Sequence, residues 1–436
     1  MLAKLLMEEV ITFNPLRILT VNDIYCEDPS PIRGGYATLA TMLRMSREEV
    51  SKSVTVVAGD VLGGSSLTTF FEGSWVVDVF QELKVDFACV GNHEFDYGAE
   101  VLEKLIAKSN FIWFAANVRN KDGSLLKGAH SICVRHYEVT NSTDRREVVS
   151  IGFFGVCSED TPNLSFPGNE VVFTPVLECV RDQVSELKNC HNVDYIVALT
   201  HLDLSQDIEI ARNVKGINLI IGGHNHEPYT LFEGDTMIFK AGVNAYWLGV
   251  IDLTFTASYK KFSNQRKLEV FHSWSMKVNI GYEPDVSVYN ILKEKYNVKA
   301  DYERANGMNK VLVSRLPFRL DTKFSTVRSK SCAMGGLIAD AIRAQCRSDL
   351  ALINGGFIRG DRIYEKGSFI SARDIIAELP FKSKVVSILV SGEQLKNILE
   401  ERPPGERLQV FTVNNEDVVD RRNYSLGVTV FSRGRG

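Results

Sequence analysis

Two short strings in this chain gather the residue types that bind metal ions. GNHEFD occupies residues 91–96 and GGHNHE occupies residues 222–227, and each follows an apolar, strand-like run. Three further turns, NDIY at 22–25, AGD at 58–60 and LTH at 199–201, also end such runs. Asp, Asn and His supply carboxylate, amide and imidazole ligands to divalent ions. Together the five turns predict a metal centre built on loops, with a metal-held water as the reactive group.

The mixture of ligands predicts two ions that share one carboxylate. Asp60 is the predicted bridge, because a tight turn after the strand-like run VTVV can project its side chain. We expect Asp23 and His226 to complete one ion with Asp60. In HNH at 224–226 the two histidines are two residues apart, so on an extended segment they point to the same side and can serve neighbouring ions. The predicted ligands of the other ion are Asn92, His201 and His224.

His93 remains for the substrate in this interpretation. Asp96 lies three residues further on and can orient and charge its imidazole. Each of these residues also has an interpretation that involves no metal. A single Asp after a strand is usually a turn residue or a helix cap, and His201 alone could be a hydrogen-bonded core histidine. Only the joint pattern of the five turns favours a metal centre over these alternatives.

With these motifs in this order, the chain resembles the 5′-nucleotidase family of calcineurin-like metallophosphoesterases from about residue 17 to its end. The resemblance implies an α/β fold, with a four-layer αββα sandwich followed by a smaller α/β substrate-specificity domain. We place the sandwich at 15–275, a connecting helix at 284–310, and the second domain at 311–436. The resemblance also identifies the six predicted ligands as the family's metal ligands, and His93 with Asp96 as its catalytic dyad.

The activity implied is hydrolysis of a phosphomonoester, most of all a nucleoside 5′-monophosphate, with two divalent ions such as Zn, Mn, Mg or Co. Two alternatives stay open: a phosphatase of a phosphorylated sugar or sugar acid, and a catalytically impaired binding member of the family. In the family, an arginine, the polar residues of a Gly-rich turn and two phenylalanines that sandwich a base form the substrate pocket. The positions that match them here are Arg328, Asn354, Arg359, Phe381 and Phe431.

One departure from the family lies in the first motif. Where the family has Asp-x-His, this chain has Asp23-Ile24-Tyr25. A phenol has an unperturbed pKa of about 10, and its neutral form is a poor ligand for a divalent ion. The first ion is therefore expected to bind weakly, to change in identity, or to take water or Glu27 or Asp28 as a substitute ligand. The alternative is that Tyr25 packs beside the site.

Two further departures concern the predicted pocket. Phe357 takes the place of a family glycine and is expected to narrow the pocket. After the position of Phe431 the family continues through a turn whose aspartate contacts the ribose, whereas this sequence stops at Gly436. We therefore expect a fragment, a shortened form, or a pocket without the ribose contact.

Composition and charge bear on the partners and the location of the protein. A formal net charge of −4 gives no electrostatic reason to expect nucleic-acid binding. Glu8 and Glu9 interrupt the apolar start of the chain, so no signal peptide is expected, and no apolar run is long enough to predict a membrane partner. The eight cysteines are scattered singly, which favours reduced thiols and a cytoplasmic location. The sequence leaves the oligomeric state open.

Overall fold

The computed structural model describes residues 9–25, 34–259, 266–381, 383–400, 408–412 and 423–430. Phe431, Glu27 and Asp28, which the sequence analysis named, lie outside these ranges. The chain divides into two compact units. The first contains residues 1–63 and 71–295, and the second contains residues 64–70 and 296–436. Helix α3 (Ser66–Phe71) and helix α9 (Val286–Ala305) each contribute to both units.

Two mixed sheets form the centre of the first unit. In the described residues, one has seven strands in the order β1-β14-β2-β3-β4-β5, with β15 beside β14. The other has six, in the order β12-β13-β11-β10-β8-β7. The first sheet consists of β1 (Glu9–Thr12), β2 (Leu16–Val21), β3 (Lys52–Val57), β4 (Phe87–Cys89), β5 (Ile112–Phe114), β14 (Trp247–Tyr259) and β15 (Arg266–Val278). The second sheet consists of β7 (Ile132–Thr140), β8 (Arg146–Cys157), β10 (Tyr195–His201), β11 (Leu219–Gly222), β12 (Pro228–Glu233) and β13 (Thr236–Ala241).

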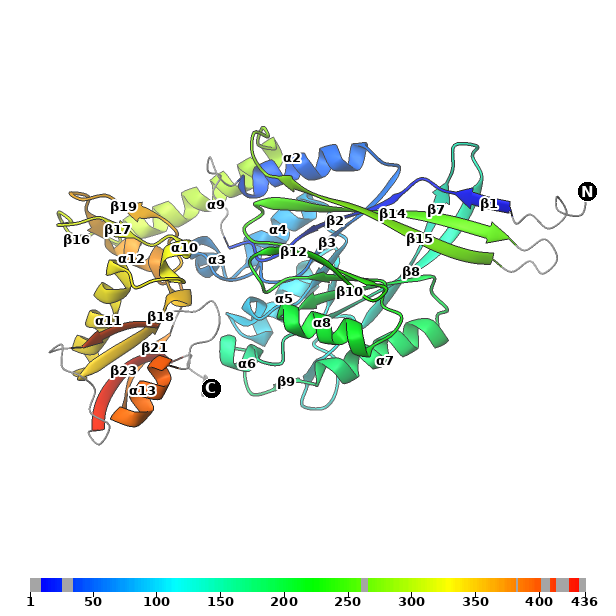
Figure 1. The fold of residues 1–436 in the computed structure, drawn as a ribbon. Helices are drawn as coiled ribbons and strands as arrows, with labels where there is room; N and C mark the ends of the chain where they lie inside the picture. The colour runs from blue at the N-terminus through cyan, green and yellow to red at the C-terminus, as the bar shows by residue number, and fades with distance from the viewer. Residues whose placement is uncertain are drawn as a thin grey trace, which may run out of the picture. The chain divides into compact units, whose positions relative to one another are not determined.

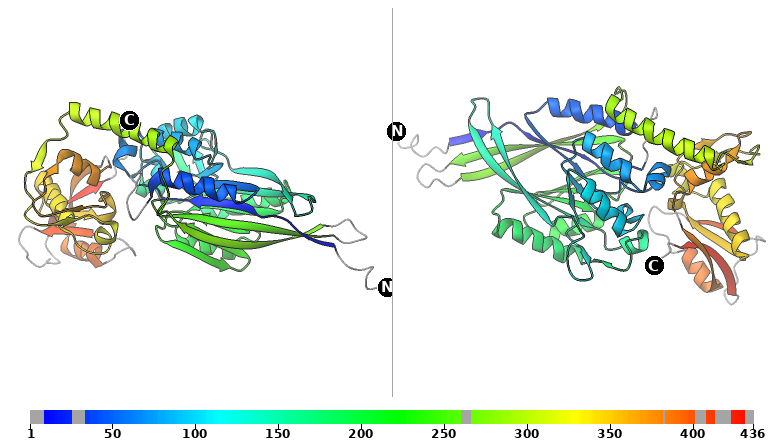
Figure 2. Two further views of the ribbon diagram at one scale, coloured as in Figure 1. Left: turned by 90° about the horizontal axis from the view of Figure 1, so that it is seen from above. Right: turned by 180° about the vertical axis from the view of Figure 1, so that it is seen from behind.

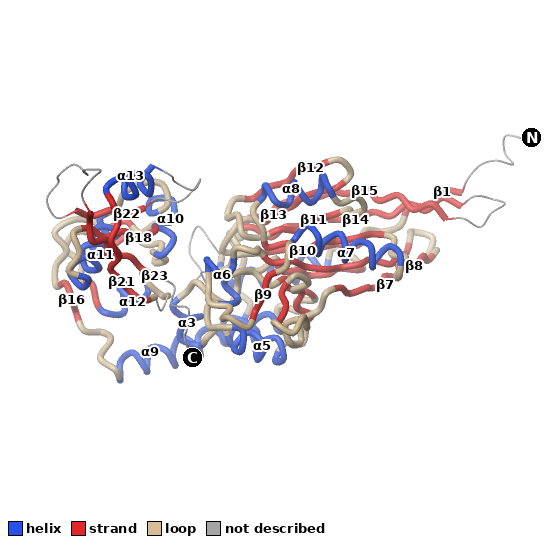
Figure 3. Tube along the Cα trace, turned by 90° about the horizontal axis from the view of Figure 1, so that it is seen from below, coloured by secondary structure: helices blue, strands red, loops and turns tan. Residues whose placement is uncertain are grey.

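The two sheets pack face to face through a continuous apolar core. Ile18 of β2 and Phe87 of β4 belong to the same buried cluster as Phe153 of β8 and Leu199 of β10. Figure 3 shows the strands of the two sheets running in nearly the same direction through the unit. Because both faces of the central strands are covered, β2, β10 and β11 are buried along their whole length.

Helices cover the outer face of each sheet. A second cluster joins β8, β10, β11 and β13 to helices α7 and α8, through residues such as Val180 and Ile210. On the opposite side, Tyr36 of α2 packs edge-on against Trp75 of α4 with ring centres 5.5 Å apart. Figures 1 and 2 show α2 and α4 on one outer side of the sheets and α7 and α8 on the other. The helices and short elements of this unit are α2 (Gly35–Glu48), α4 (Ser74–Glu82), η1 (His93–Phe95), α5 (Ala99–Lys108), β6 (Val118–Asn120), α6 (Thr161–Leu164), β9 (Val171–Phe173), α7 (Val176–Asn189) and α8 (Leu204–Asn213).

Parallel pairing brings the predicted site residues to one edge of the unit. Strands β2, β3, β4 and β5 are mutually parallel, as are β8, β10, β11 and β13. Ligands in such sheets gather outside the carboxyl ends of the strands. The five predicted turns follow β2, β3, β4 and β11 or end β10, so all of them reach that edge.

The second unit contains a four-stranded sheet, in the order β21-β23-β18-β22, within the described residues. Alternate side chains of β18 pack into two separate hydrophobic cores. Ala351 and Ile353 pack with Ile338 of α11, whereas Leu350 packs with Leu395 of α13. The elements are β16 (Val311–Val313), β17 (Leu320–Asp321), α10 (Phe324–Val327), α11 (Ala333–Cys346), β18 (Leu350–Asn354), η2 (Gly355–Phe357), β19 (Ile363–Tyr364), β20 (Ile370–Ser371), α12 (Ala372–Glu378), β21 (Lys384–Ser391), α13 (Gly392–Glu400), β22 (Leu408–Thr412) and β23 (Asn423–Val430).

The architecture confirms the predicted fold class of a four-layer α/β sandwich with a smaller α/β unit after it. The two compact units differ in detail from the predicted domain limits, since residues 64–70 join the second unit and the first unit extends to Lys295. Among the described residues, no helix combines the length and the apolar character that crossing a membrane requires.

Candidate metal centre

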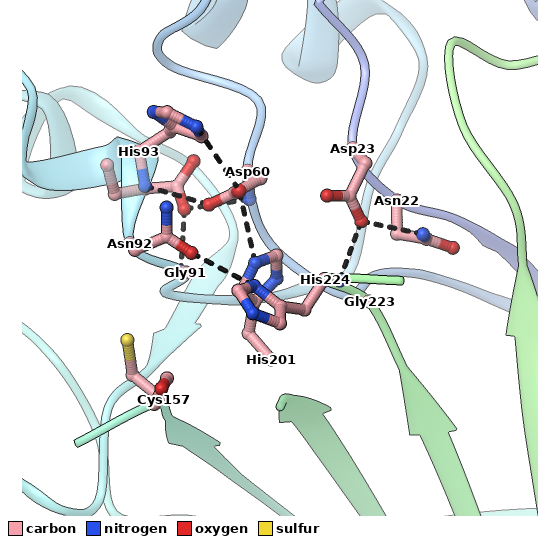
Figure 4. A network of polar contacts seen from close by, with 12 residues as sticks. Asn22, Asp23, Asp60, Gly91, Asn92, His93, Cys157, His201, Gly223 and His224 are labelled. Atoms are coloured by element: carbon pink, nitrogen blue, oxygen red, sulfur yellow. Dashed lines mark hydrogen bonds and ion pairs between the residues drawn. The ribbon is translucent and has the colours of Figure 1, made fainter. Parts of the chain in front are cut away.

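Three predicted ligands have a strained backbone. Asp23, Asp60 and His224 adopt left-handed conformations, with φ of 52°, 57° and 74°. Asp and His enter this region more readily than most residues, yet a non-glycine residue there costs roughly 1–3 kcal/mol. Figure 4 shows the three side chains converging from separate loops. Such strain clusters at functional sites, so the backbone supports a functional role for this edge of the sheets.

His201 has the hydrogen-bond pattern of a metal-binding imidazole. Its Nδ1 lies 2.8 Å from the carbonyl oxygen of Ala58, so Nδ1 carries the proton and donates it. Its buried Nε2 has no hydrogen-bond partner among the described residues and lies 3.1 Å from Asp60 Oδ2. Burial lowers the pKa of His201, but the charges of Asp60 and Asp23 outweigh burial and raise the pKa to about 10. The pair therefore attracts positive charge, which a divalent ion would supply.

The ligand atoms of three predicted ligands lie close enough together to share one ion. Among the described His, Cys, Asp and Glu side chains, the set whose ligand atoms all lie within 4.8 Å of one another is Asp60, His201 and His224. Asn92 Oδ1 lies 3.2 Å from His224 Nδ1, so both atoms can face the same ion (Figure 4). Burial and the charge of His201 lower the pKa of His224 to about 4, which leaves a neutral imidazole with a lone pair for metal at neutral pH. These four residues fit one divalent ion.

Asp23 and His226 are the two predicted ligands that lie outside this set of four. Asp23 Oδ1 lies 3.4 Å from His226 Nε2 and 2.9 Å from the hydroxyl oxygen of Tyr25. The same hydroxyl lies 2.8 Å from Asp60 Oδ2. Tyr25, whose role the sequence left open, therefore contacts both carboxylates of the predicted first ion.

His93 and Asp96 form a hydrogen-bonded pair beside Asp60. His93 Nδ1 lies 3.1 and 3.0 Å from the two carboxylate oxygens of Asp96, and Ser165 Oγ donates to Asp96 at 2.8 Å. This contact keeps the proton on Nδ1, so that Nε2 can serve the substrate. His93 Nε2 lies 4.0 Å from Asp60 Oδ2, too far for a hydrogen bond. The geometry fits a group that acts on a substrate.

Glu94 organises two of these loops, a role that the sequence analysis missed although the residue lies inside GNHEFD. Its buried carboxylate accepts backbone N–H groups from Asp60 at 2.8 Å, Val61 at 2.7 Å, Leu62 at 3.1 Å and Gly91 at 2.6 Å. A Cβ atom at Gly91 would overlap with Asp60 Oδ1, so a glycine is needed there. Glu94 thus ties the loop of the predicted bridge to the loop that bears Asn92.

Lys240 organises two other loops and was also missed. A charged residue inside the apolar strand β13 is the signal that could have revealed it. Its fully buried Nζ lies 2.8 Å from Asp207 Oδ2 and donates to the carbonyl oxygens of Leu202 at 2.7 Å and Gly223 at 2.8 Å. Leu202 follows His201 and Gly223 precedes His224. The lysine therefore links the loops that carry two imidazole ligands.

Replacing Lys240 by methionine should destabilise the protein strongly, because it leaves the carboxylate of Asp207 buried without its partner. We expect the free energy of unfolding to fall by about 3–5 kcal/mol, measured by urea denaturation of the metal-free protein. Lys121→Met is the matched control, since Lys121 also lies 2.8 Å from its partner, Glu170, but that pair is exposed. The control should cost less than about 1 kcal/mol. Equal losses in both variants would contradict the role of burial.

The predicted substrate residues of the second unit group around the Gly-rich turn. Asn354 ends β18 and its Oδ1 accepts the backbone N–H of Gly356 at 2.9 Å. The guanidinium carbon of Arg359 lies 5.1 Å from the centre of the Phe381 ring. Phe357 packs edge-on against the same ring with centres 5.8 Å apart. The structure thus brings Arg359 and Phe381 together and places Phe357, the departure from the family, against them.

The remaining predicted substrate residue of the described chain, Arg328, follows α10 and lies over the ring of Phe324 at 5.9 Å. Buried Glu378, a residue that the sequence analysis did not single out, supports the turn that bears Arg359. Its carboxylate accepts the backbone N–H of Gly360 at 3.2 Å and the hydroxyl of Tyr364 at 2.7 Å. Glu378 therefore fixes the backbone of the turn that bears Arg359.

Comparisons with known proteins agree with both units. Residues 16–228 match the family model of calcineurin-like phosphoesterases, and residues 311–416 match that of the 5′-nucleotidase C-terminal domain. The 5′-nucleotidase of Bos taurus is 27% identical over 91% of this chain and 74% of that protein. The trifunctional nucleotide phosphoesterase YfkN of Bacillus subtilis is 25% identical over 83% of this chain and 26% of that protein. The crystal structure of a 5′-nucleotidase precursor from Thermus thermophilus has the same fold, with a TM-score of 0.75 and 21% identity, over 95% of this chain and 89% of that one.

The sandwich, its loop-borne candidate ligands and these matches define a calcineurin-like metallophosphoesterase, a hydrolase of phosphoric ester bonds from a family that uses divalent metals. With the second unit included, the chain belongs to the 5′-nucleotidase family of that class. The predicted recognition and enzyme class are confirmed. The roles of single site residues and the number of ions stay predictions.

Proposed function

We propose that this protein hydrolyses a phosphate monoester, most of all a nucleoside 5′-monophosphate, with metal held by the loops of the first unit. The observation that supports the metal centre best is the pair Asp60 and His201, whose buried ligand atoms face each other at 3.1 Å. Asp60, Asn92, His201 and His224 would hold the ion. When bound, a divalent ion there supplies a water made nucleophilic near neutral pH and a positive charge for the phosphoryl oxygens.

The side chains of this protein supply the remaining chemistry. His93 would face the leaving oxygen with Nε2 and move a proton to it, because its Nδ1 proton is already held by Asp96. Asp60 keeps the neighbouring backbone aligned, since its Oδ1 accepts the backbone N–H of His93 at 2.8 Å. This hydrogen bond connects the loop that bears the dyad to the predicted ligand Asp60.

Nucleotide specificity is proposed to come from the second unit. The curated relatives named above are nucleotidases or nucleotide phosphoesterases by their names, which favours a nucleotide for this chain. Phe381 offers a ring for base stacking, and Arg359 lies close enough to meet an anion beside it. Arg328, Asn354 and Phe431 complete the proposed pocket, of which Phe431 lies outside the described residues.

Replacing Phe381 by alanine tests the nucleotide proposal. Loss of one stacking contact, worth on the order of 1–3 kcal/mol, should raise KM for a nucleoside 5′-monophosphate by about 5- to 150-fold. Hydrolysis of a small aryl phosphate should stay unchanged, because stacking acts on the base. Phe369→Ala is the control, since Phe369 is an exposed phenylalanine of the same unit. Equal losses on both substrates would mean that Phe381 only supports the fold.

A phosphorylated sugar or sugar acid is the second candidate substrate. The observation in its favour is Phe357, which occupies a family glycine position and packs against Phe381 where a base would stack. A panel of nucleoside 5′-monophosphates and sugar phosphates, assayed with Mn²⁺, separates the two candidates. Faster turnover of sugar phosphates, together with unchanged kinetics in Phe381→Ala, would favour the second.

A further inference from the structure

The hydroxyl of Tyr25 lies between two buried carboxylates. It is 2.9 Å from Asp23 Oδ1 and 2.8 Å from Asp60 Oδ2. Both are hydrogen-bond distances, and the single hydroxyl proton can be donated to either carboxylate. Tyr25 is 4% exposed, and the two aspartates are 0% and 1% exposed, so solvent does not compete for the contacts.

The phenol is held in this position from several sides. Its backbone N–H donates to Asn244 Oδ1 at 3.1 Å. Its ring packs edge-on against the imidazole of His93 and tilted against that of His226, each with ring centres 5.4 Å apart. The hydroxyl therefore cannot leave the carboxylates without disturbing residues on two other loops.

The two oxygens that Tyr25 contacts are the ones that face the imidazoles of predicted ligands. Asp23 Oδ2 already accepts from Asn22 Nδ2 at 2.7 Å and from the backbone N–H of His224 at 2.9 Å. Asp60 Oδ1 accepts the backbone N–H of His93. The other two oxygens face predicted imidazole ligands, Asp23 Oδ1 at 3.4 Å from His226 Nε2 and Asp60 Oδ2 at 3.1 Å from His201 Nε2. The Tyr25 hydroxyl lies against both of these oxygens. A neutral phenol is a poor ligand for a divalent ion, so this donor set does not fit one.

We propose that the protein holds one resident divalent ion, at Asp60, Asn92, His201 and His224, and that the Tyr25 hydroxyl replaces the second ion between the carboxylates. The inference rests on the proposed function as a metal-dependent hydrolase. It gives Asp23 a positioning role, since its Oδ2 holds the backbone of His224. A chain with histidine at position 25 would then bind the two ions that the sequence analysis expects.

Titration of metal-free protein with Mn²⁺ tests the proposal without an activity measurement. Calorimetry and elemental analysis of wild type should give one tightly bound ion per chain, with any further ion at least about 100-fold weaker. Electron paramagnetic resonance should show the signal of an isolated Mn²⁺ ion. Tyr25→His should bind two ions and show the signal of an exchange-coupled pair. Two equally tight, coupled ions in wild type would overturn the proposal.

Tyr25→Phe is the matched control, because it keeps the ring and removes only the hydroxyl. It should retain the single tight ion, since Tyr25 is not a ligand in this proposal; loss of that ion would overturn it. A visible phenolate charge-transfer band in Fe³⁺-loaded wild type, absent from Tyr25→Phe, would equally make Tyr25 a ligand. A failure of the proposed function would give a different result from a failure of this inference. Wild type would then bind one Mn²⁺ per chain and hydrolyse neither nucleoside monophosphates nor an aryl phosphate.

Discussion

Removal of bound metal should reduce hydrolysis of phosphate monoesters to the background rate, and added Mn²⁺ or Zn²⁺ should restore it. The nucleophile in this protein is expected to be a water whose pKa a divalent ion lowers, and without the ion its pKa returns to that of bulk water. Exhaustive chelation, followed by elemental analysis and an assay with an aryl phosphate, measures the effect. Undiminished hydrolysis by verified metal-free protein would refute a metal-dependent mechanism.

The ligand variant His201→Ala should reproduce the metal-free state. It removes the Nε2 atom that faces Asp60 and leaves the buried carboxylate without that partner. His136→Ala is the matched control, because His136 is an exposed histidine whose ring contacts only Ser150 among the hydrogen bonds described for it. We expect the control to keep both its metal and its activity. Metal content measured in parallel separates loss of the ion from loss of the fold, which circular dichroism monitors.

Replacing His93 by alanine should lower kcat by about 10²–10⁴-fold, the range for a positioned acid–base group. Metal content should stay near that of wild type, because His93 Nε2 lies 4.0 Å from Asp60 and Nδ1 faces Asp96. The largest loss is expected with a substrate whose leaving oxygen needs a proton, such as a nucleoside monophosphate. An aryl phosphate with an acidic leaving group should lose less. Loss of metal from the variant would instead identify His93 as a ligand.

Asp96→Asn tests the same dyad from its other end. The amide can no longer stabilise a charged imidazole, so kcat should fall by less than in His93→Ala while the fold is retained. Asp160→Asn serves as the control, since Asp160 is an exposed aspartate that accepts only the local side chain of Asn163 among the side-chain hydrogen bonds described for it. If Asp96→Asn has wild-type kinetics, the pair does not work as a dyad.

The sequence could place the candidate ligands near one another, because each predicted ligand stands at a fixed place in a short local motif. Asp60, Asn92 and His224 come directly after apolar strands. Parallel strands expose their carboxyl ends at one edge, so residues at those ends meet whatever the details of packing. The order of the motifs also indicated the family and the four-layer fold, both of which are confirmed.

The tertiary structure decided which side chains support these ligands and what Tyr25 contacts. Glu94 and Lys240 act through hydrogen bonds to backbone groups of distant loops, which no local pattern reports. The hydroxyl of Tyr25 meets Asp60, 35 residues away, only because β2 and β3 are paired in register. A motif specifies which ligand atoms are available, since it depends on neighbours in the chain. The packing of separate loops determines whether an ion or a phenol fills the space between two carboxylates.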